Sequence, residues 1–200
     1  MAAIVVFHHI LGLTPGVEAL ADDLRAAGHT VHTPDLYAGR RFDSIEAGAA
    51  FAQGPEAPDL DALADAAVAG LPADLVYLGI SSGVMQAQRL AQTRPGAAGA
   101  ILLEATVPIT GDWAFGPWPE GVPVQIHGME ADPFFAGEGD IDAARAIVAA
   151  VPGAELHVYP GDRHLFEDRS LPSYDADAAA LLTARVLAFL STVDGVGAAG

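Results

Sequence analysis

One stretch decides the fold of this 200-residue chain, Leu75-Val76-Tyr77-Leu78-Gly79-Ile80-Ser81-Ser82-Gly83-Val84-Met85. An apolar run that ends in serines between glycines is typical of a buried strand that turns sharply into a helix. Gly79 and Gly83 stand two residues either side of Ser81, where such a turn leaves room only for glycine. The corresponding positions around Ser82 hold a bulky isoleucine and valine. We therefore predict a G-x-S-x-G elbow in which Ser81 is the nucleophile and Ser82 contributes its backbone N–H.

Short apolar runs and helical patterns alternate along the rest of the chain. The strands are predicted at residues 3–7, 30–33, 75–80, 98–103, 123–127 and 154–159, and the helices at 15–27, 61–70, 84–93, 141–150 and 175–190. This alternation predicts an α/β protein with a mostly parallel sheet of about six strands and helices on both faces. The domain is expected to span residues 1–192, and a flexible C-terminal tail is expected at 193–200.

The composition is that of a folded, acidic protein. Apolar residues make up 52% of the chain and charged residues 18%, which excludes a disordered protein. The formal net charge of −17 repels phosphate backbones and anionic lipids, so we expect no nucleic acid and no membrane partner. Without cysteine the chain has no disulfide and no thiol nucleophile. The N-terminus lacks a basic signal region, and no apolar run approaches the roughly 18 residues of a spanning helix, so we expect a cytoplasmic protein.

The residues that could activate a serine follow other predicted strands, at the edge of a parallel sheet where ligands bind. His164 follows the last strand and is the predicted general base. Asp132 follows the fifth strand and is the predicted acid that orients His164, because the order Ser, Asp, His is expected on this kind of sheet. Glu104 and Glu130 are alternatives to Asp132, although a structural or surface role suits each of them better.

The loop after the first strand supplies further candidates. An oxyanion formed during acyl transfer needs two preorganised N–H donors, and we predict those of Ile10 and Ser82. His8 and His9 could instead bind a metal, but neighbouring residues at a strand end point in opposite directions and no carboxylate lies at ligand spacing. We therefore predict neither a metal nor a cofactor.

Taken together, these motifs resemble the dienelactone hydrolase family of α/β-hydrolases. The matching pieces are His9-Ile10-Leu11-Gly12, Pro34-Asp35-Leu36-Tyr37, the elbow, Asp132, and His164 with Phe166. The resemblance implies the three-layer α/β-hydrolase fold and a serine hydrolase that works through an acyl-enzyme. By the same resemblance, Ser81, His164 and Asp132 form a catalytic triad, and Ile10 and Ser82 form the oxyanion hole.

Three positions depart from the pattern of that family. The namesake members carry cysteine in the elbow and a glutamate in the first-strand loop, where this chain has Ser81 and His9. They also hold the substrate carboxylate with an arginine four residues after the catalytic histidine, and the matching residue here is Asp168, followed by Arg169. A negative charge at Asp168 would repel an anionic substrate. The implied substrate is therefore a small, neutral ester, thioester or lactone.

Aromatic side chains are available to line a substrate pocket. Trp113 lies in the long irregular segment 106–121, whose aromatic residues could equally fold that segment onto the core. We expect His9, Trp113, Phe134 and Phe166 to contact the substrate. Two other functions stay open, a non-hydrolytic ligand-binding protein on the same fold and a lyase or isomerase that uses His9 as an extra acid or base. The sequence does not indicate an oligomeric state.

Overall fold

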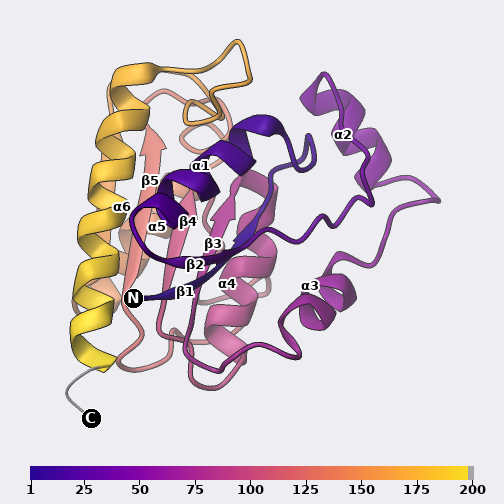
Figure 1. Ribbon diagram of the computed structural model, residues 1–200. Helices are drawn as coiled ribbons and strands as arrows, with labels where there is room; N and C mark the ends of the chain where they lie inside the picture. The colour runs from indigo at the N-terminus through magenta and orange to yellow at the C-terminus, as the bar shows by residue number, and fades with distance from the viewer. Residues whose placement is uncertain (198–200) are drawn as a thin grey trace.

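Six parallel strands form the sheet at the centre of the computed structural model, which describes residues 1–197 (Figure 1). The strands are β1 (Ala3–Phe7), β2 (Thr30–His32), β3 (Leu75–Ile80), β4 (Gly99–Leu103), β5 (Val124–Met129) and β6 (Glu155–Tyr159). Their order across the sheet is β2-β1-β3-β4-β5-β6, and every neighbouring pair is parallel. These parallel pairs confirm the predicted fold class. Each crossover between parallel strands returns the chain to the same edge of the sheet.

Helices cover both faces of this sheet (Figure 1). They are α1 (Pro15–Ala26), α2 (Ile45–Ala52), α3 (Leu60–Val68), α4 (Val84–Thr93), α5 (Asp140–Ala150) and α6 (Ala176–Gly197), with a short 3₁₀ segment η1 (Ser81–Gly83). Helices α1 and α6 pack on one face, and α3, α4 and α5 pack on the other. Helix α1 begins as predicted, since the Thr14 hydroxyl accepts a hydrogen bond from the Val17 N–H and proline occupies the first turn.

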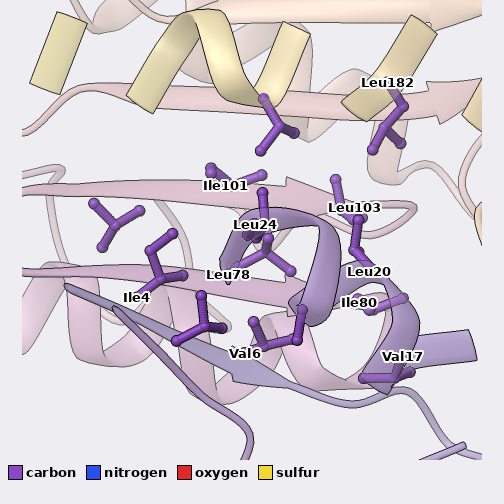
Figure 2. Packing of buried hydrophobic residues seen from close by; sticks show 14 of the residues in the cluster. Ile4, Val6, Val17, Leu20, Leu24, Leu78, Ile80, Ile101, Leu103 and Leu182 are labelled. Atoms are coloured by element: carbon purple, nitrogen blue, oxygen red, sulfur yellow. The ribbon is translucent and has the colours of Figure 1, made fainter. Parts of the chain in front are cut away.

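The central strands bury side chains on both faces because helices cover both. In β1, Ile4 and Val6 pack toward α1 and α6, whereas Val5 and Phe7 belong to the cluster under α3, α4 and α5. Figure 2 shows the first of these clusters, in which side chains from β1, β3 and β4 meet those of α1 and α6. This two-sided burial explains why the strands read in the sequence as continuous apolar runs rather than alternating ones.

Two elements differ from the sequence-based expectations. Helix α2 was not predicted, because only Gly48 in it is fully buried and no apolar stripe marks it; it stands apart from the sheet in Figure 1. Helix α6 continues through Gly197, into the predicted tail, and residues 198–200 lie outside the described part of the chain.

Helix α6 also corrects the expectation that no segment is long and apolar enough to cross a membrane. By length and composition alone, its window Ala176–Val193 passes that test, because alanine and leucine dominate it and charged residues are rare. In the fold, the helix packs on the sheet through Leu182, Val186 and Leu190, all fully buried. Its apolar face therefore belongs to the domain core.

The turn from β3 into α4 has the strained backbone that the elbow prediction requires. Ser81 adopts a left-handed φ of 49°, which is uncommon for a residue with a side chain. A Cβ added at Gly79 would lie 2.6 Å from the Gly83 carbonyl oxygen, and one added at Gly83 would lie 2.3 Å from the carbonyl oxygen of Phe7. The two glycines are therefore needed because the elbow packs directly against its own helix and the end of β1.

Replacement of Gly83 by alanine should lower the free energy of unfolding by about 1–3 kcal/mol, because the new methyl group would overlap the Phe7 carbonyl oxygen. Urea unfolding would measure the change. Gly70→Ala is the matched control, since a Cβ at Gly70 would meet no atom within 4 Å. Equal unfolding midpoints and slopes for the two variants would contradict the proposed steric need for glycine.

Candidate active site

The structure brings the three predicted reactive residues together at the carboxyl edge of the sheet. The Ser81 Oγ lies 2.8 Å from the Nε2 of His164. The other ring nitrogen of His164, Nδ1, lies 2.7 Å from the Oδ2 of Asp132. Since a carboxylate accepts only, Nδ1 carries the donated proton and Nε2 is free to accept from the serine hydroxyl. This is the arrangement in which a histidine can take a proton from a serine.

Asp132 is itself held by backbone donors. Its Oδ1 accepts hydrogen bonds from the Phe134 N–H at 2.8 Å and the Phe135 N–H at 3.3 Å, and the side chain is fully buried. These bonds fix the carboxylate so that Oδ2 faces His164. One oxygen of Asp132 thus fixes the carboxylate to the backbone, and the other orients the ring of His164.

Glu104, the alternative acid, occupies a different place. Its nearest oxygen is 3.8 Å from the Nδ1 of His164, too far for a hydrogen bond. Its carboxyl oxygens accept instead from the N–H groups of Leu165, at 2.6 Å, and Phe166, at 3.0 Å. Burial raises the pKa of Glu104 well above its ordinary value, and the nearby Glu167 raises it further. Glu104 therefore organises the loop that carries His164, and the other alternative, Glu130, is exposed.

The two predicted oxyanion donors flank Ser81. Ile10 and Ser82 both line the cavity above the serine. The turn that carries Ile10 is closed by a hydrogen bond from the Gly12 N–H to the His9 carbonyl at 3.0 Å. Within residues 1–197, no protein group accepts a hydrogen bond from the Ile10 N–H. This donor is therefore available to a substrate oxygen.

A cavity of about 390 Å³ opens above Ser81. It is lined by Ile10, Ile45, Ser81, Ser82, Val84, Met85, Glu104, Ala105, Thr106, Val107, Pro108, Trp113, Phe134, Glu138, Asp140 and His164. Most of the lining is apolar, its three carboxyl groups are those of Glu104, Glu138 and Asp140, and it includes neither lysine nor arginine. Phe134 packs against the ring of His164 at 4.6 Å between centroids, and Trp113 is 83% exposed.

Two of the four residues expected to contact substrate do not line this cavity. His9 and Phe166 are fully buried beneath it, so their positions correct that expectation. Asp168, expected to repel an anionic substrate, is also buried outside the cavity, and its neighbour Arg169 pairs with Asp23 at the surface. The acidic groups that a substrate would meet are instead Glu138 and Asp140, contributed by the segment before and at the start of α5. No motif in the sequence marks Glu138, Asp140 or Ile45 of α2 as a site residue.

The histidines after β1 are part of the loop structure. The Nδ1 of His8 lies 2.8 Å from the His9 carbonyl oxygen, and its Nε2 accepts from the Leu36 N–H at 3.1 Å. The Nδ1 of His9 accepts from the Leu11 N–H at 3.2 Å, and its Nε2 lies 2.9 Å from the Oδ2 of Asp168. All four ring nitrogens therefore have partners within the protein, so the geometry does not favour these histidines as a metal-binding pair.

A second grouping, Glu104, Asp132 and His164, has ligand atoms within 4.8 Å of one another and could in principle hold a metal ion. The same atoms make the hydrogen bonds described above, from His164 to Asp132 and from two backbone N–H groups to Glu104. A metal bound there would replace those bonds. The arrangement is thus accounted for by hydrogen bonding among protein groups.

Comparisons with known proteins agree with this fold. A model of the dienelactone hydrolase family matches residues 119–194, the segment that contains Asp132 and His164. No curated protein sequence matches the chain. The chain has the α/β-hydrolase fold, and its predicted resemblance to the dienelactone hydrolase family is confirmed.

Several solved structures are similar over nearly the whole chain. A protein from Klebsiella pneumoniae, provisionally named a dienelactone hydrolase, is 22% identical with a TM-score of 0.69, covering 96% of this chain and 87% of that one. A dienelactone hydrolase-like promiscuous phosphotriesterase from metagenomic libraries is 17% identical with a TM-score of 0.71 and the same coverage. A thermostable carboxyl esterase from Bacillus coagulans is 14% identical with a TM-score of 0.65, covering 96% and 90%.

Asp168 should give the protein acid-sensitive stability. Burial opposes its ionisation, but hydrogen bonds from His9, Ser170 and Thr14 outweigh burial and lower its pKa from 3.8 to about 2. A lowered pKa stabilises the fold above the unfolded value, and this contribution is lost as the pH falls from 3.8 through 2. Asp168→Asn should therefore lower the free energy of unfolding by at least about 2 kcal/mol near pH 7, and by progressively less toward pH 2.

Urea unfolding of both proteins between pH 2 and pH 7 would measure this difference. Asp142→Asn is the control, because Asp142 is an exposed residue paired with Arg145 and its loss should change stability little. A difference between wild type and Asp168→Asn that stays constant with pH would contradict the prediction.

Proposed function

We propose that this protein is a serine hydrolase that cleaves small, neutral esters, thioesters or lactones through an acyl-enzyme intermediate. The observation that carries the proposal is the continuous hydrogen-bonded series from Ser81 through His164 to Asp132, with the serine hydroxyl at the floor of an apolar cavity. Similar structures named as an esterase and as dienelactone hydrolases support the same class of chemistry.

In the first step, the Ser81 oxygen attacks the substrate carbonyl while its proton moves to the Nε2 of His164. The positive charge that develops on the imidazole is stabilised by the Asp132 carboxylate at Nδ1, 2.7 Å away. The carbonyl oxygen becomes negatively charged and is stabilised by the N–H groups of Ile10 and Ser82. Return of the proton from Nε2 to the leaving oxygen or sulfur frees the alcohol or thiol, which stays attached to the acyl group when the substrate is a lactone, and leaves Ser81 acylated.

The second step repeats the first with water in place of the serine. His164 Nε2 takes a proton from a water molecule, the resulting hydroxide attacks the acyl carbonyl, and the same two N–H groups stabilise the second oxyanion. The proton then returns to the Ser81 oxygen as the acid leaves. Each step uses one proton and one neutral histidine, so the enzyme is restored without a cofactor.

The cavity favours an uncharged substrate. Its walls are mainly apolar, and an anionic group would lie near Glu138 and Asp140 in a protein of formal net charge −17. Burial raises the pKa of Asp140 above its ordinary value, with a further contribution from Glu138, so a second negative charge there would be costly. The cytoplasmic location, and the absence of nucleic acid and membrane partners, stay predictions from the sequence.

Replacement of Ser81 by alanine should reduce kcat for p-nitrophenyl acetate by roughly 10⁴-fold or more, because no other group would form the acyl-enzyme. Ser82→Ala is the matched control, since it removes a neighbouring hydroxyl but keeps the backbone N–H, and it should lower kcat far less. A fluorophosphonate should label wild type at Ser81. A folded wild-type protein that is neither labelled nor active would instead favour the ligand-binding alternative.

Replacement of Asp132 by asparagine should lower kcat by about 10⁴-fold, because the amide would favour the wrong tautomer of His164. Glu104→Gln should have a much smaller effect on kcat and a larger one on stability, since Glu104 bonds the backbone of the His164 loop. Ester hydrolysis and urea unfolding of both variants would test this. The reverse ranking of the two kcat values would identify Glu104 as the triad acid.

A further inference from the structure

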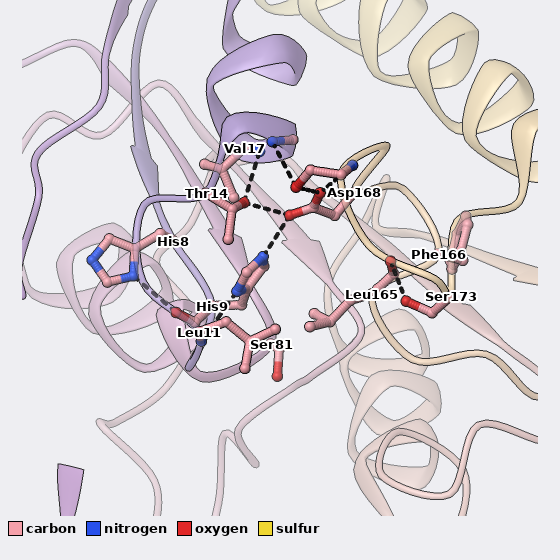
Figure 3. A network of polar contacts seen from close by, with 12 residues as sticks. His8, His9, Leu11, Thr14, Val17, Ser81, Leu165, Phe166, Asp168 and Ser173 are labelled. Atoms are coloured by element: carbon pink, nitrogen blue, oxygen red, sulfur yellow. Dashed lines mark hydrogen bonds and ion pairs between the residues drawn. The ribbon is translucent and has the colours of Figure 1, made fainter. Parts of the chain in front are cut away.

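A second buried histidine–carboxylate pair lies beside the reactive residues, formed by His9 and Asp168 (Figure 3). The His9 Nε2 is 2.9 Å from the Asp168 Oδ2, with side-chain exposures of 0% and 1%. The pair joins two loops that are far apart in sequence. His9 immediately precedes Ile10, the predicted oxyanion donor, and Asp168 lies four residues after His164, the predicted base.

The hydrogen bonds around this pair fix the tautomer of His9. The Nδ1 of His9 accepts from the Leu11 N–H, so its proton must be on Nε2, where it is donated to Asp168. The ring therefore connects the backbone of the Ile10 turn directly to the carboxylate. Neither nitrogen can exchange its role without losing a partner.

The carboxylate of Asp168 is equally committed. Its Oδ2 accepts from His9 and from the Thr14 hydroxyl, and its Oδ1 accepts from the Ser170 N–H at 2.8 Å and the Ser170 hydroxyl at 2.6 Å. It packs against α1 so closely that a Cβ on Gly16 would overlap it. Asparagine at position 168 would lose some of these hydrogen bonds, because its amide nitrogen would face donors in place of either oxygen.

We propose that His9 and Asp168 are positioning residues, whose hydrogen bond sets the Ile10 N–H at the distance from Ser81 and His164 that oxyanion stabilisation requires. This inference rests on the proposed hydrolase function. Ser81 is held by the elbow and His164 by its own loop, whereas the turn carrying Ile10 is connected to the His164 loop through this pair. A donor displaced by a fraction of an ångström stabilises the oxyanion less while leaving substrate contacts in the cavity nearly unchanged.

Two variants of His9 separate the two halves of its ring. Asparagine places its carbonyl oxygen near the position of Nδ1, so His9→Asn can keep the bond to Leu11 but cannot reach Asp168. Glutamine places its amide nitrogen near the position of Nε2, so His9→Gln can keep the bond to Asp168 but loses that to Leu11. Ser173→Ala is the control, because it removes a hydrogen bond to the Leu165 carbonyl within the same loop and leaves the pair intact.

The experiment measures kcat and KM for p-nitrophenyl acetate, with kcat expressed per site labelled by fluorophosphonate. We expect His9→Asn to lower kcat per labelled site about tenfold or more with KM within about threefold, and His9→Gln and Ser173→Ala to stay within about threefold of wild type. The pH midpoint of kcat/KM should not move, because the bond between His164 and Asp132 is untouched. A merely structural role would change the number of labelled sites and not the turnover of each.

Several results would overturn the inference. Full turnover per site in His9→Asn would do so, as would an equal loss in the asparagine and glutamine variants. If His9→Asn labels no sites, Thr14→Val and Thr14→Ser take its place, since valine removes one donor to Asp168 and serine keeps it. Turnover per site should then fall in the valine variant alone, and equal values would reject the inference. Failure of the proposed function is a separate outcome, an unlabelled and inactive wild type.

Discussion

The left-handed backbone at Ser81 is the constraint on which the rest of the site depends. Such a conformation costs a residue with a side chain of order 1–3 kcal/mol, and it persists only where the surroundings enforce it. Here the enforcement is steric, because the backbone at Gly83 lies directly against the carbonyl groups at the end of β1. The same contact that raises the serine above the sheet therefore also places it beside the loop that follows β1, where the Ile10 N–H is found.

Much of the fold could be predicted because strands with helices on both faces appear in the sequence as continuous apolar runs. Strands β1 and β3 and helix α4 have the predicted bounds, since the strands are continuous apolar runs and the helical pattern stops shortly before Pro95. Helix α2 shows no such pattern, because only Gly48 in it is fully buried and Ile45 and Phe51 pack only partly against the core. A short helix with so little buried surface has no clear periodic apolar face from which to predict it.

The site divides in the same way. Ser81, Asp132 and His164 could be found from residue type and position after a strand, and the structure brings them within hydrogen-bonding distance. The orientation of side chains within a loop could not be found, which is why His9 was expected in the cavity. Hydrogen bonds to the Leu11 N–H and to Asp168 hold its ring in the core, and Asp168 is buried there and does not line the cavity. The pairing of His9 with Asp168 depends on a contact between residues 159 apart, which the sequence does not reveal.

Asp132 and Glu104 are both buried near His164, but only Asp132 orients it. The difference comes from the other contacts that each carboxyl group makes. Asp132 uses one oxygen for backbone donors and leaves the other for His164, whereas Glu104 uses both for the Leu165 and Phe166 N–H groups. Burial beside Glu167 also favours the neutral form of Glu104, and a neutral carboxyl group does little to stabilise a protonated histidine. Asp132 therefore orients His164 through Nδ1, while Glu104 holds the backbone of the loop that carries His164.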